Sequence, residues 1–359
     1  MQLTVRAPFN ALLGYGHVSW NLCDALSQSV GLSIFPIGGL RATNAAKLNF
    51  KGFQTFNPSD PCLTIWHEHD LIANALGKGK KVAYPFFELN AFDELRLKNL
   101  RAIDEIIVAS DWAKQVLDEN GIKTPCTVAP PGVNQEIFKS VEVADHPYRF
   151  FTFGKYEYRK GTELVADFFG KAFSPTDNVE LYICCDSPLE KIRSQVDSFV
   201  ERLQNHPMRD RIKVVQGSFE SDAELAQFFQ IMDCGVFPTR AEGYGLPILQ
   251  SMACGKQIIT TDYSGHTQFC TTDNAHLVHI EHFEPASDGV WFGGIGTWAA
   301  IGKKQCEEFV EIMRGLYKNE ISLKYPNVEK FTWENCTNNV LLAFDYGRFK
   351  ERYSTKSTL

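Results

Sequence analysis

Short apolar runs alternate with amphipathic stretches along the first 130 residues, and this alternation restricts the possible folds more than any other feature of the sequence. The runs expected to form strands lie at residues 3–7, 32–35, 62–66, 81–86, 105–110 and 126–129. Helices are expected at residues 18–26 and 111–119, and Ser110 and Gly121 are of the residue types that begin and end the second helix. Strands that alternate with helices favour a parallel sheet covered by helices on both faces.

The same alternation starts again after a polar segment at residues 139–148. Further strands are expected at residues 149–154, 179–185, 212–217, 234–238 and 257–261, and further helices at 162–173, 189–203, 223–231, 246–253, 303–317 and about 333–349. A chain of 359 residues is also long enough for two domains of ordinary size. We therefore predict two doubly wound α/β domains, at residues 1–142 and 148–325, with a cleft between them. Ligands of such sheets bind at the carboxyl ends of the strands.

Composition and charge exclude several classes of protein. Hydrophobic residues make up 44% and charged residues 22%, which is typical of a globular protein. The net charge is −7, and neither half of the chain has the excess of Lys and Arg that marks a nucleic-acid-binding surface. One basic cluster, Lys78, Lys80 and Lys81, is either a solvated loop or a local site for an anionic acceptor or a membrane surface.

We expect no targeting or membrane-spanning segment. The first nine residues lack the apolar core of a signal peptide, and no apolar run reaches the roughly 20 residues that span a bilayer. The ten cysteines form no C-x-x-C pair, and several, such as Cys184, Cys185 and Cys234, lie in apolar runs as small buried hydrophobic residues do. We therefore expect a cytoplasmic protein, with peripheral attachment to a membrane left open.

The strongest functional signal is the segment TRAEGYGLP, residues 239–247, between an expected strand and an expected helix. Gly243 and Gly245 allow a ligand to approach the backbone, and Pro247 suits the first turn of a helix. The N–H groups at the helix start can hold an anion such as a pyrophosphate. Glu242 would repel a phosphate, so its carboxylate is better suited to accept hydrogen bonds from sugar hydroxyls. The alternative is an ordinary strand–turn–helix junction.

A second signal, GKYEYRKG at residues 154–161, follows another strand of the same expected domain. Lys155, Arg159 and Lys160 bring three cations to the end of that strand. Lysines in such a position can neutralise a diphosphate leaving group without a metal. A solvated charged loop is the alternative, which is less favoured because both loops follow strands of one sheet.

A third signal, Gly14-Tyr15-Gly16, precedes the first expected helix and invites comparison with a dinucleotide-binding fingerprint. The comparison fails, because Ser19 occupies the place of the third glycine and the strand at 32–35 is not followed by an acidic residue. A dehydrogenase is therefore disfavoured. A glycine turn that faces the cleft remains an option.

Together these motifs resemble retaining glycosyltransferases of the GT-B fold, in glycosyltransferase family 4 (glycosyl transferases group 1). The segment EGYGLPILQSMACG, residues 242–255, resembles the family signature, in which a second glutamate follows the first by eight residues. GYGHVSWNLCDAL, VAPPGVNQEIF and TFGKYEYRKG resemble its N-terminal glycine loop, its interdomain segment and its basic donor loop. The resemblance extends over most of the chain.

The resemblance implies two Rossmann-like domains that face a central cleft. One is an acceptor-side domain at residues 1–142, on which a C-terminal helix at about 333–359 packs back, and the other is a donor-binding domain at 148–325. The implied donor is a nucleotide diphosphate sugar, UDP- or GDP-linked, with no metal or other cofactor. Lys155 and Lys160 would contact the diphosphate, and Glu242 the sugar hydroxyls. The other positions assigned to the donor are Gly14, Gly16, Arg159, Gly217, Gly243, Tyr244, Gly245, Leu246 and Gln250.

Three positions depart from the family pattern. Gln250 stands in place of the second signature glutamate, which usually accepts hydrogen bonds from the ribose, and its amide carbonyl can still accept one. Lys155 stands where arginine is common, which gives up bidentate contact with phosphate. Glu88 follows the strand at residues 81–86, where many members have a histidine, and is the nearest polar candidate for work on the acceptor.

His67 and His69, at the end of the strand at residues 62–66, are a second pair of acceptor-side candidates. A plain surface or capping pair is the alternative. Their His-x-His spacing could also suggest a metal, but two ligands do not make a site, so we expect no metal.

We therefore predict a retaining, metal-independent hexosyl- or pentosyltransferase in which Glu242, Lys160 and Glu88 are the candidate catalytic residues. The acceptor is left open between a glycan, a lipid carrier, a protein and a modified nucleic acid. Two alternatives remain. One is a GT-B nucleotide-sugar epimerase, and the other is a catalytically inactive subunit that binds sugar nucleotides, which Gln250 suggests. Release of nucleoside diphosphate with and without acceptors separates the three.

Overall fold

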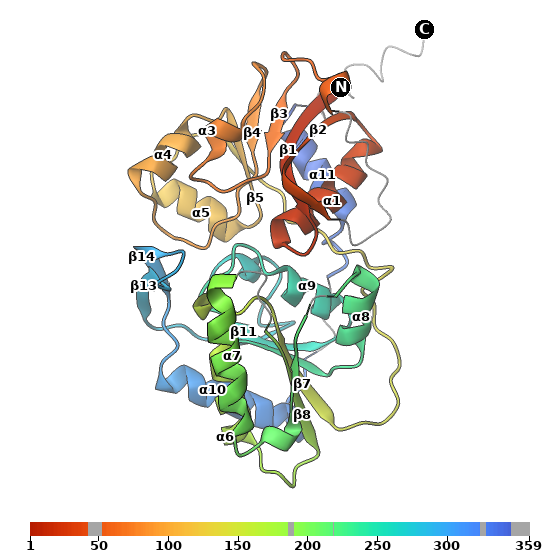
Figure 1. Cartoon of the computed structure of the whole chain (residues 1–359), viewed down its shortest axis with the longest axis vertical. Helices are drawn as coiled ribbons and strands as arrows, with labels where there is room; N and C mark the ends of the chain where they lie inside the picture. The colour runs from red at the N-terminus through yellow and green to blue at the C-terminus, as the bar shows by residue number, and fades with distance from the viewer. Residues whose placement is uncertain (42–51, 186–189, 218, 324–327, 346–359) are drawn as a thin grey trace. The chain divides into compact units, whose positions relative to one another are not determined.

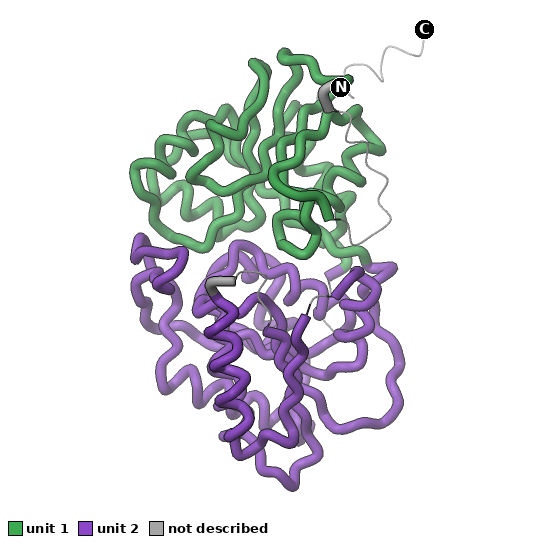
Figure 2. The backbone as a smooth tube through the Cα atoms, in the orientation of Figure 1, with its two compact units in different colours: residues 1–134, 329–359 green, residues 135–328 purple. Residues whose placement is uncertain are grey.

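The computed structural model describes residues 1–41, 52–185, 190–217, 219–323 and 328–345. The chain forms two compact units, which Figure 2 shows in two colours. Unit 1 comprises residues 1–134 and 329–359, and unit 2 comprises residues 135–328. The chain therefore leaves unit 1 once and returns to it for its last helix.

Unit 1 is built on a six-stranded parallel sheet in the order β2-β1-β3-β4-β5-β6 (Figure 1). Its strands are β1 (Gln2–Asn10), β2 (Gly31–Arg41), β3 (Cys62–Thr64), β4 (Lys81–Ala83), β5 (Glu105–Val108) and β6 (Cys126–Val128). Its helices are α1 (Gly14–Ser27), α2 (Gly52–Thr55), α3 (Leu71–Asn74), α4 (Glu94–Arg101), α5 (Asp111–Glu119) and α11 (Trp333–Leu342). The C-terminal α11 packs against α1 and β6.

Unit 2 has a second six-stranded parallel sheet, in the order β12-β11-β10-β7-β8-β9. Its strands are β7 (Tyr148–Phe153), β8 (Val179–Cys184), β9 (Ile212–Val215), β10 (Cys234–Phe237), β11 (Gln257–Thr261) and β12 (His276–Val278). The α-helices are α6 (Thr162–Ala172), α7 (Glu190–Gln204), α8 (Asp222–Gln230), α9 (Leu246–Ala253) and α10 (Lys303–Tyr317). An antiparallel hairpin, β13 (Phe283–Ser287) and β14 (Gly293–Ala299), precedes α10.

Adjacent phenylalanines of β7 build the two faces of the second core. Side chains of successive strand residues point to opposite faces of a sheet. Phe150 joins the face covered by α6, α7 and α10, where the rings of Phe168 and Phe309 stack with their centroids 5.0 Å apart. Phe151 packs on the other face against Phe229 of α8, at 5.4 Å between centroids. Helices therefore cover the sheet on both sides, as the sequence pattern predicts.

The parallel sheets and their helices confirm the predicted α/β class. The helices α5, α9 and α10 have the bounds that the sequence predicts. Ser110 caps α5 by accepting a hydrogen bond from the Ala113 N–H, and Gly121, with φ +69°, follows its end. Pro247 lies in the first turn of α9. Local capping chemistry fixed these boundaries, and it can be read from the sequence.

The prediction that the first helix starts at residue 18 was wrong. α1 begins at Gly14, so Gly14 and Gly16 belong to its first turn and not to a preceding loop. A Cβ at Gly16 would lie 1.9 Å from the carbonyl oxygen of Asn10, because the helix starts directly against the end of β1. This close approach requires glycine.

The last helix was predicted too long, and several described elements were not predicted, namely α2, α3, α4, β12 and the hairpin β13–β14. α11 ends at Leu342, and Asp345 has φ +56°, a left-handed conformation that interrupts a helix. Parts of two predicted helices lie outside the described residues, namely residues 346–349 of the last helix and residue 189 of the helix predicted at 189–203. α4 was missed because it buries only Asn99 and Leu100, which gives little apolar period. The hairpin β13–β14 was missed because its second strand opens with the glycine-rich sequence GGIG.

All ten cysteines are free thiols, eight of them buried and two, Cys126 and Cys306, partly exposed. This agrees with the expectation that cysteines in apolar runs serve as small core residues. None of the helices in the described part of the chain is long and apolar enough to cross a membrane.

Substitution of Gly161 tests how closely the loops after β7 and β10 pack against each other. It has φ +66°, and a Cβ there would lie 2.1 Å from the carbonyl oxygen of Pro238. We expect Gly161→Ala to lower the free energy of unfolding by about 3 kcal/mol or more, because left-handed strain and a backbone clash add. Chemical denaturation measures this loss.

The matched control is Gly289→Ala. Gly289 has φ +71°, and no described atom outside its chain neighbours lies within 4 Å of the added Cβ. We expect a loss of about 1–2 kcal/mol from left-handed strain alone. Equal losses in the two variants would contradict the close packing of Gly161.

Candidate active site

Two loops of unit 2 meet because the strands that precede them are neighbours. β7 pairs in parallel with β10, so that Phe150 lies opposite Cys234. The order of strands reverses between them, since β8 and β9 continue on one side and β11 and β12 on the other. Ligands of α/β sheets bind at the carboxyl ends of the strands at such a reversal. The loops that follow lie side by side, and the Arg240 N–H donates to the Arg159 carbonyl at 2.7 Å.

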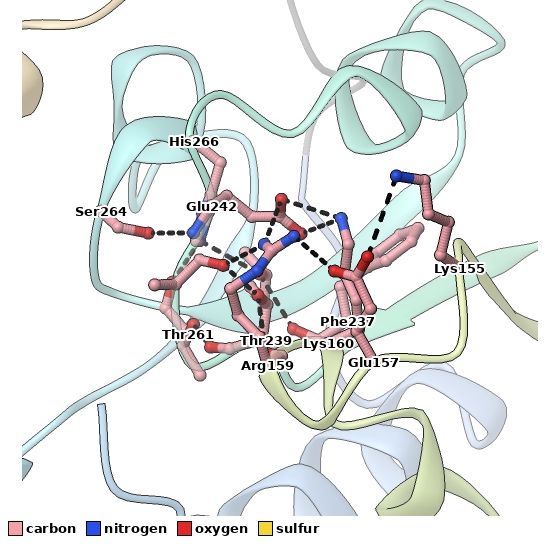
Figure 3. A network of polar contacts seen from close by, with 12 residues as sticks. Lys155, Glu157, Arg159, Lys160, Phe237, Thr239, Glu242, Thr261, Ser264 and His266 are labelled. Carbon is pink, nitrogen blue, oxygen red and sulfur yellow. Dashed lines mark hydrogen bonds and ion pairs between the residues drawn. The ribbon is translucent and has the colours of Figure 1, made fainter. Parts of the chain in front are cut away.

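Glu242 lies at the centre of this junction (Figure 3). Its side chain is only 7% exposed. Lys160 Nζ donates to both carboxylate oxygens, at 2.6 and 2.8 Å, and Arg159 Nη1 donates to one of them at 3.1 Å. The structure thus brings two residues of the second sequence signal into direct contact with the glutamate of the first.

Arg159 is engaged by protein groups. Its side chain is buried, and Nη1 donates to the Ala241 carbonyl at 2.5 Å while Nη2 donates to Glu157 at 2.8 Å. Glu157 was not singled out from the sequence, although it lies inside the basic segment. Lys155 is 38% exposed and lies 3.8 Å from Glu157. The three cations of this segment therefore have different surroundings, and Arg159 serves to join the two loops.

The environment of Glu242 keeps it ionised. Burial by itself would raise the pKa of the carboxyl group, but the Lys160 ammonium and the Arg159 guanidinium outweigh burial and hold the pKa at about 2, against an ordinary value of 4.5. Burial lowers the pKa of the neighbouring His266, which favours its neutral form. At neutral pH the site therefore contains a carboxylate between two cations.

The start of α9 lies directly after Glu242. Gly245 has φ +91° and precedes the first helical residue, Leu246, and no described side chain caps this turn. Tyr244 is buried with its ring 5.1 Å from that of Phe269. The first turn of the helix contains no acidic residue, and the positive end of its dipole lies beside the ion cluster.

A third loop, after β11, also reaches Glu242. A Cβ at Gly265 would lie 2.3 Å from the carbonyl oxygen of Gly243 and 2.8 Å from that of Glu242. No functional role was predicted for this loop from the sequence, although its residues 262–269, DYSGHTQF, resemble a later segment of the family. The signal that could have found it is the combination of a strand end and a glycine, as in the two other loops.

Gln250 and Gly217 lie on elements that start or end at the same edge of the sheet. Gln250 is only 4% exposed and lies on α9, about one helical turn after Leu246. Gly217 follows β9 and has φ +102°, a conformation that favours glycine.

The hairpin β13–β14 is attached to the same two loops. Arg240 Nε lies 3.0 Å from Glu284 of β13, and Tyr158 Oη donates to the same carboxylate at 3.1 Å. The Arg240 guanidinium stacks over the Tyr158 ring at 3.7 Å from its centroid. The Ala299 N–H donates to the Arg240 carbonyl at 2.9 Å. Arg240, which the sequence reading left without a role, thus links the hairpin to the ion cluster.

The acceptor-side candidates lie in unit 1, after β3 and β4. The rings of His67 and His69 stack with their centroids 5.3 Å apart, and Tyr15 of α1 lies 4.8 Å from His67. Tyr15 Oη donates to the Phe86 carbonyl at 2.8 Å, which joins α1 to the segment that carries the partly exposed Glu88. The structure thus places these candidates at strand ends of one sheet, with Gly14 and Gly16 in the first turn of α1.

Glu68 was not considered in the sequence reading. The ligand atoms of His67, Glu68 and His69 lie within 4.8 Å of one another, which is the spacing of a possible metal group. Glu68 is 5% exposed and accepts a hydrogen bond from Arg96 Nε at 2.8 Å, and Arg96 also pairs with Asp93. This ion pair accounts for the buried carboxylate without a metal.

Comparison with known proteins identifies the larger part of unit 2. The sequence model of the family described as "Glycosyl transferases group 1" matches residues 147–286. An uncharacterised glycosyltransferase from Methanocaldococcus jannaschii is 28% identical over 164 residues, which cover 45% of this chain and 41% of that protein. The chain spans less than half the length of the curated relatives that it matches.

Two solved structures share the fold over nearly the whole chain. Sucrose-phosphate synthase from Thermosynechococcus elongatus has a TM-score of 0.64 at 15% identity, with 99% of this chain and 100% of that chain covered. HepE from Anabaena, in complex with UDP and glucose, has a TM-score of 0.60 at 14% identity, with 100% and 99% covered. At these identities the likeness concerns the fold alone, and it confirms the predicted GT-B class.

The matched segment contains the basic loop, the glycine turn and the ionised Glu242. This segment, residues 147–286, is therefore similar to the family described as "Glycosyl transferases group 1".

Proposed function

We propose that the protein is a retaining glycosyltransferase that moves a sugar from a nucleotide diphosphate sugar to an acceptor hydroxyl. The observation that carries the proposal is the buried, ionised Glu242 in contact with Lys160, at the sheet edge where two loops meet. Such a carboxylate suits sugar hydroxyls, and the cations beside it suit a diphosphate. The family match supports the same reaction.

The donor diphosphate would bind between the basic turn and the start of α9. Lys155 is the more accessible cation, because it is 38% exposed and its pair with Glu157 is 3.8 Å long. The ammonium group of Lys160 would donate hydrogen bonds both to Glu242 and to a phosphate oxygen. The first amides of α9 would donate to the same anion. These groups together stabilise the negative charge that grows on the diphosphate as it leaves, so the proposed reaction does not require a metal.

Glu242 would orient the sugar and would not take a proton from the acceptor. A carboxylate with a pKa of about 2 is a weak base. Its two oxygens are suited to accept hydrogen bonds from sugar hydroxyls, which holds the anomeric carbon in place. The bond between the anomeric carbon and the diphosphate oxygen breaks while the acceptor hydroxyl attacks from the same face. The hydroxyl proton passes to the departing diphosphate, and the configuration is retained. In this mechanism the enzyme contributes positioning and electrostatic stabilisation.

We propose UDP as the nucleotide part of the donor, because the structural neighbour HepE was solved in complex with UDP and glucose. Gly217 would lie beside the base, and the amide of Gln250 would accept from the ribose. Unit 1 would serve the acceptor, with His67, His69 and Glu88 as its candidate polar residues. The imidazoles and the carboxylate offer hydrogen bonds suited to hydroxyl groups.

The function is tested by measuring release of the nucleoside diphosphate (UDP or GDP) from UDP-glucose and other UDP- and GDP-sugars, with and without a panel of acceptors. Acceptor-dependent release is the result that we expect. Conversion of the donor sugar without an acceptor would instead indicate an epimerase. Binding without any release or conversion would indicate an inactive subunit.

Lys160→Gln tests the diphosphate site. We expect UDP binding to weaken about 10- to 100-fold, because one charge-assisted hydrogen bond to phosphate contributes about 1.5–3 kcal/mol. Binding of UMP should weaken less, since it lacks the second phosphate. Calorimetry with both nucleotides measures the difference. The control is Lys303→Gln, because Lys303 is 90% exposed and pairs only loosely, at 3.7 Å, with Glu307. If Lys160→Gln leaves the preference for UDP over UMP intact, Lys160 is not a phosphate ligand.

Glu242→Gln tests the sugar site. We expect transfer to fall at least about 100-fold, because the amide offers one neutral acceptor in place of two charged oxygens. Affinity for UDP should change less than affinity for the intact sugar nucleotide. Steady-state kinetics and calorimetry measure the two effects, with the exposed Glu307→Gln as control. Turnover close to that of the wild type would refute the proposed role.

The same variant tests the ionisation of Glu242. A carboxyl group whose pKa falls from 4.5 to about 2 on folding stabilises the fold above pH 4.5, and this contribution is lost as the pH falls from 4.5 to about 2. The difference corresponds to about 3 kcal/mol at neutral pH. We expect the free energy of unfolding of the wild type to fall more steeply between pH 5 and pH 3 than that of Glu242→Gln. Parallel pH profiles would contradict an ionised Glu242.

A further inference from the structure

The loop after β11 fixes the main chain of Glu242. Ser264 Oγ accepts a hydrogen bond from the Glu242 N–H at 2.8 Å. The next residue, Gly265, donates its N–H to the Glu242 carbonyl at 2.9 Å. Both polar main-chain groups of Glu242 are therefore bound by two consecutive residues of one loop, of which Figure 3 shows Ser264.

Ser264 holds this position in a strained backbone conformation. Its φ is +80° and its ψ is −161°, a region that is almost exclusive to glycine. The residue is 1% exposed, so its hydroxyl does not serve solvation. A glycine would adopt the same conformation without strain. A serine at such a position is understandable if the hydroxyl itself is needed.

The loop is anchored well enough to act as a support. His266 is fully buried, and its Nε2 lies 2.7 Å from the Thr261 carbonyl. Thr267 Oγ1 donates to the Ser264 carbonyl at 2.7 Å. Thr261 Oγ1 donates to the carbonyl of Thr239, just after β10, at 2.6 Å. The support of Glu242 is thus attached to β11 and to the loop that carries Glu242.

We propose that Ser264 is a positioning residue for the donor sugar, which acts by holding the main chain of Glu242. Lys160 and Arg159 hold the carboxylate at one end of the residue, and the Ser264 hydroxyl holds the peptide N–H at the other. With both ends fixed, the carboxylate oxygens have one orientation toward the sugar hydroxyls. The inference rests on the proposed role of Glu242, and it concerns the sugar part of the donor and not the nucleotide.

Two substitutions separate positioning from stability. Ser264→Gly removes the hydroxyl and also the backbone strain, so we expect a thermal midpoint close to that of the wild type. Ser264→Ala removes the hydroxyl and keeps the strain, so we expect a lower midpoint. In both variants we expect the ratio of the dissociation constants of UDP-glucose and UDP to rise about tenfold, with UDP itself bound as in the wild type. Calorimetry with UDP and UDP-glucose measures the ratio.

The glycine variant decides the question. A ratio that rises in Ser264→Gly supports positioning, because this variant is not destabilised. A ratio in Ser264→Gly equal to that of the wild type overturns the proposal. This holds even if the ratio rises in Ser264→Ala, because the rise would then follow from the lower stability of that variant. If Ser264→Gly does not fold, hydrogen exchange at the Glu242 amide in Ser264→Ala decides, because a changed ratio in that variant alone could follow from lost stability. Glu242→Gln is the reference for a ratio in which the contact of Glu242 with the sugar is directly weakened.

Hydrogen exchange keeps this test independent of the proposed function. If the wild-type protein binds neither UDP-glucose nor UDP, the assigned donor is wrong. Hydrogen exchange then tests whether Ser264 holds the main chain of Glu242. In that case the amide of Glu242 should exchange faster in both Ser264 variants than in the wild type, whereas the buried strand amide of Val236 should not. Unchanged exchange at Glu242 overturns the proposed hold on its main chain.

Discussion

The ion cluster around Glu242 is the interaction on which the geometry of the candidate site depends. Two carboxylates, Glu157 and Glu242, meet two cations, Arg159 and Lys160, in surroundings that exclude most water. Burying such charges is unfavourable unless each is paired, and removal of one partner typically costs 3–5 kcal/mol because it leaves an uncompensated charge. The cluster therefore selects one arrangement of the two loops, since any displacement would separate buried opposite charges.

The topology of the second sheet explains why this cluster can form from residues about 80 positions apart. β7 starts the unit, the chain then winds outward to β9, and β10 returns to pair with β7. Because β10 pairs with β7, the carboxyl ends of these two strands lie beside each other. The parallel sheet thus supplies the framework, the loops supply the charges, and the start of α9 adds a dipole of matching sign for an anion. Unit 1 repeats the principle, with Tyr15 of α1 joined to the segment after β4.

Much of this could be predicted from the sequence wherever local chemistry determines the structure. Ser110 before α5 and Pro247 in α9 mark helix starts by hydrogen bonding and ring geometry, and both predictions are confirmed. Gly16 was misread because its requirement for glycine comes from the carbonyl of Asn10, a contact that appears only when β1 and α1 are folded together. Ser264 could not be recognised, because its strain and its bond to Glu242 are properties of the tertiary structure.

The hydrogen bond between the Arg240 N–H and the Arg159 carbonyl has a consequence for which residues of this site can be exchanged. Because main-chain groups and buried side chains fix the loops, the exposed Lys155 can vary without disturbing their shape. An exchange between lysine and arginine at that position then alters the contact with phosphate while the scaffold stays the same. Directed evolution toward new donors would therefore find its tolerant positions at the accessible residues of the basic turn, and its forbidden ones at Arg159 and Gly161.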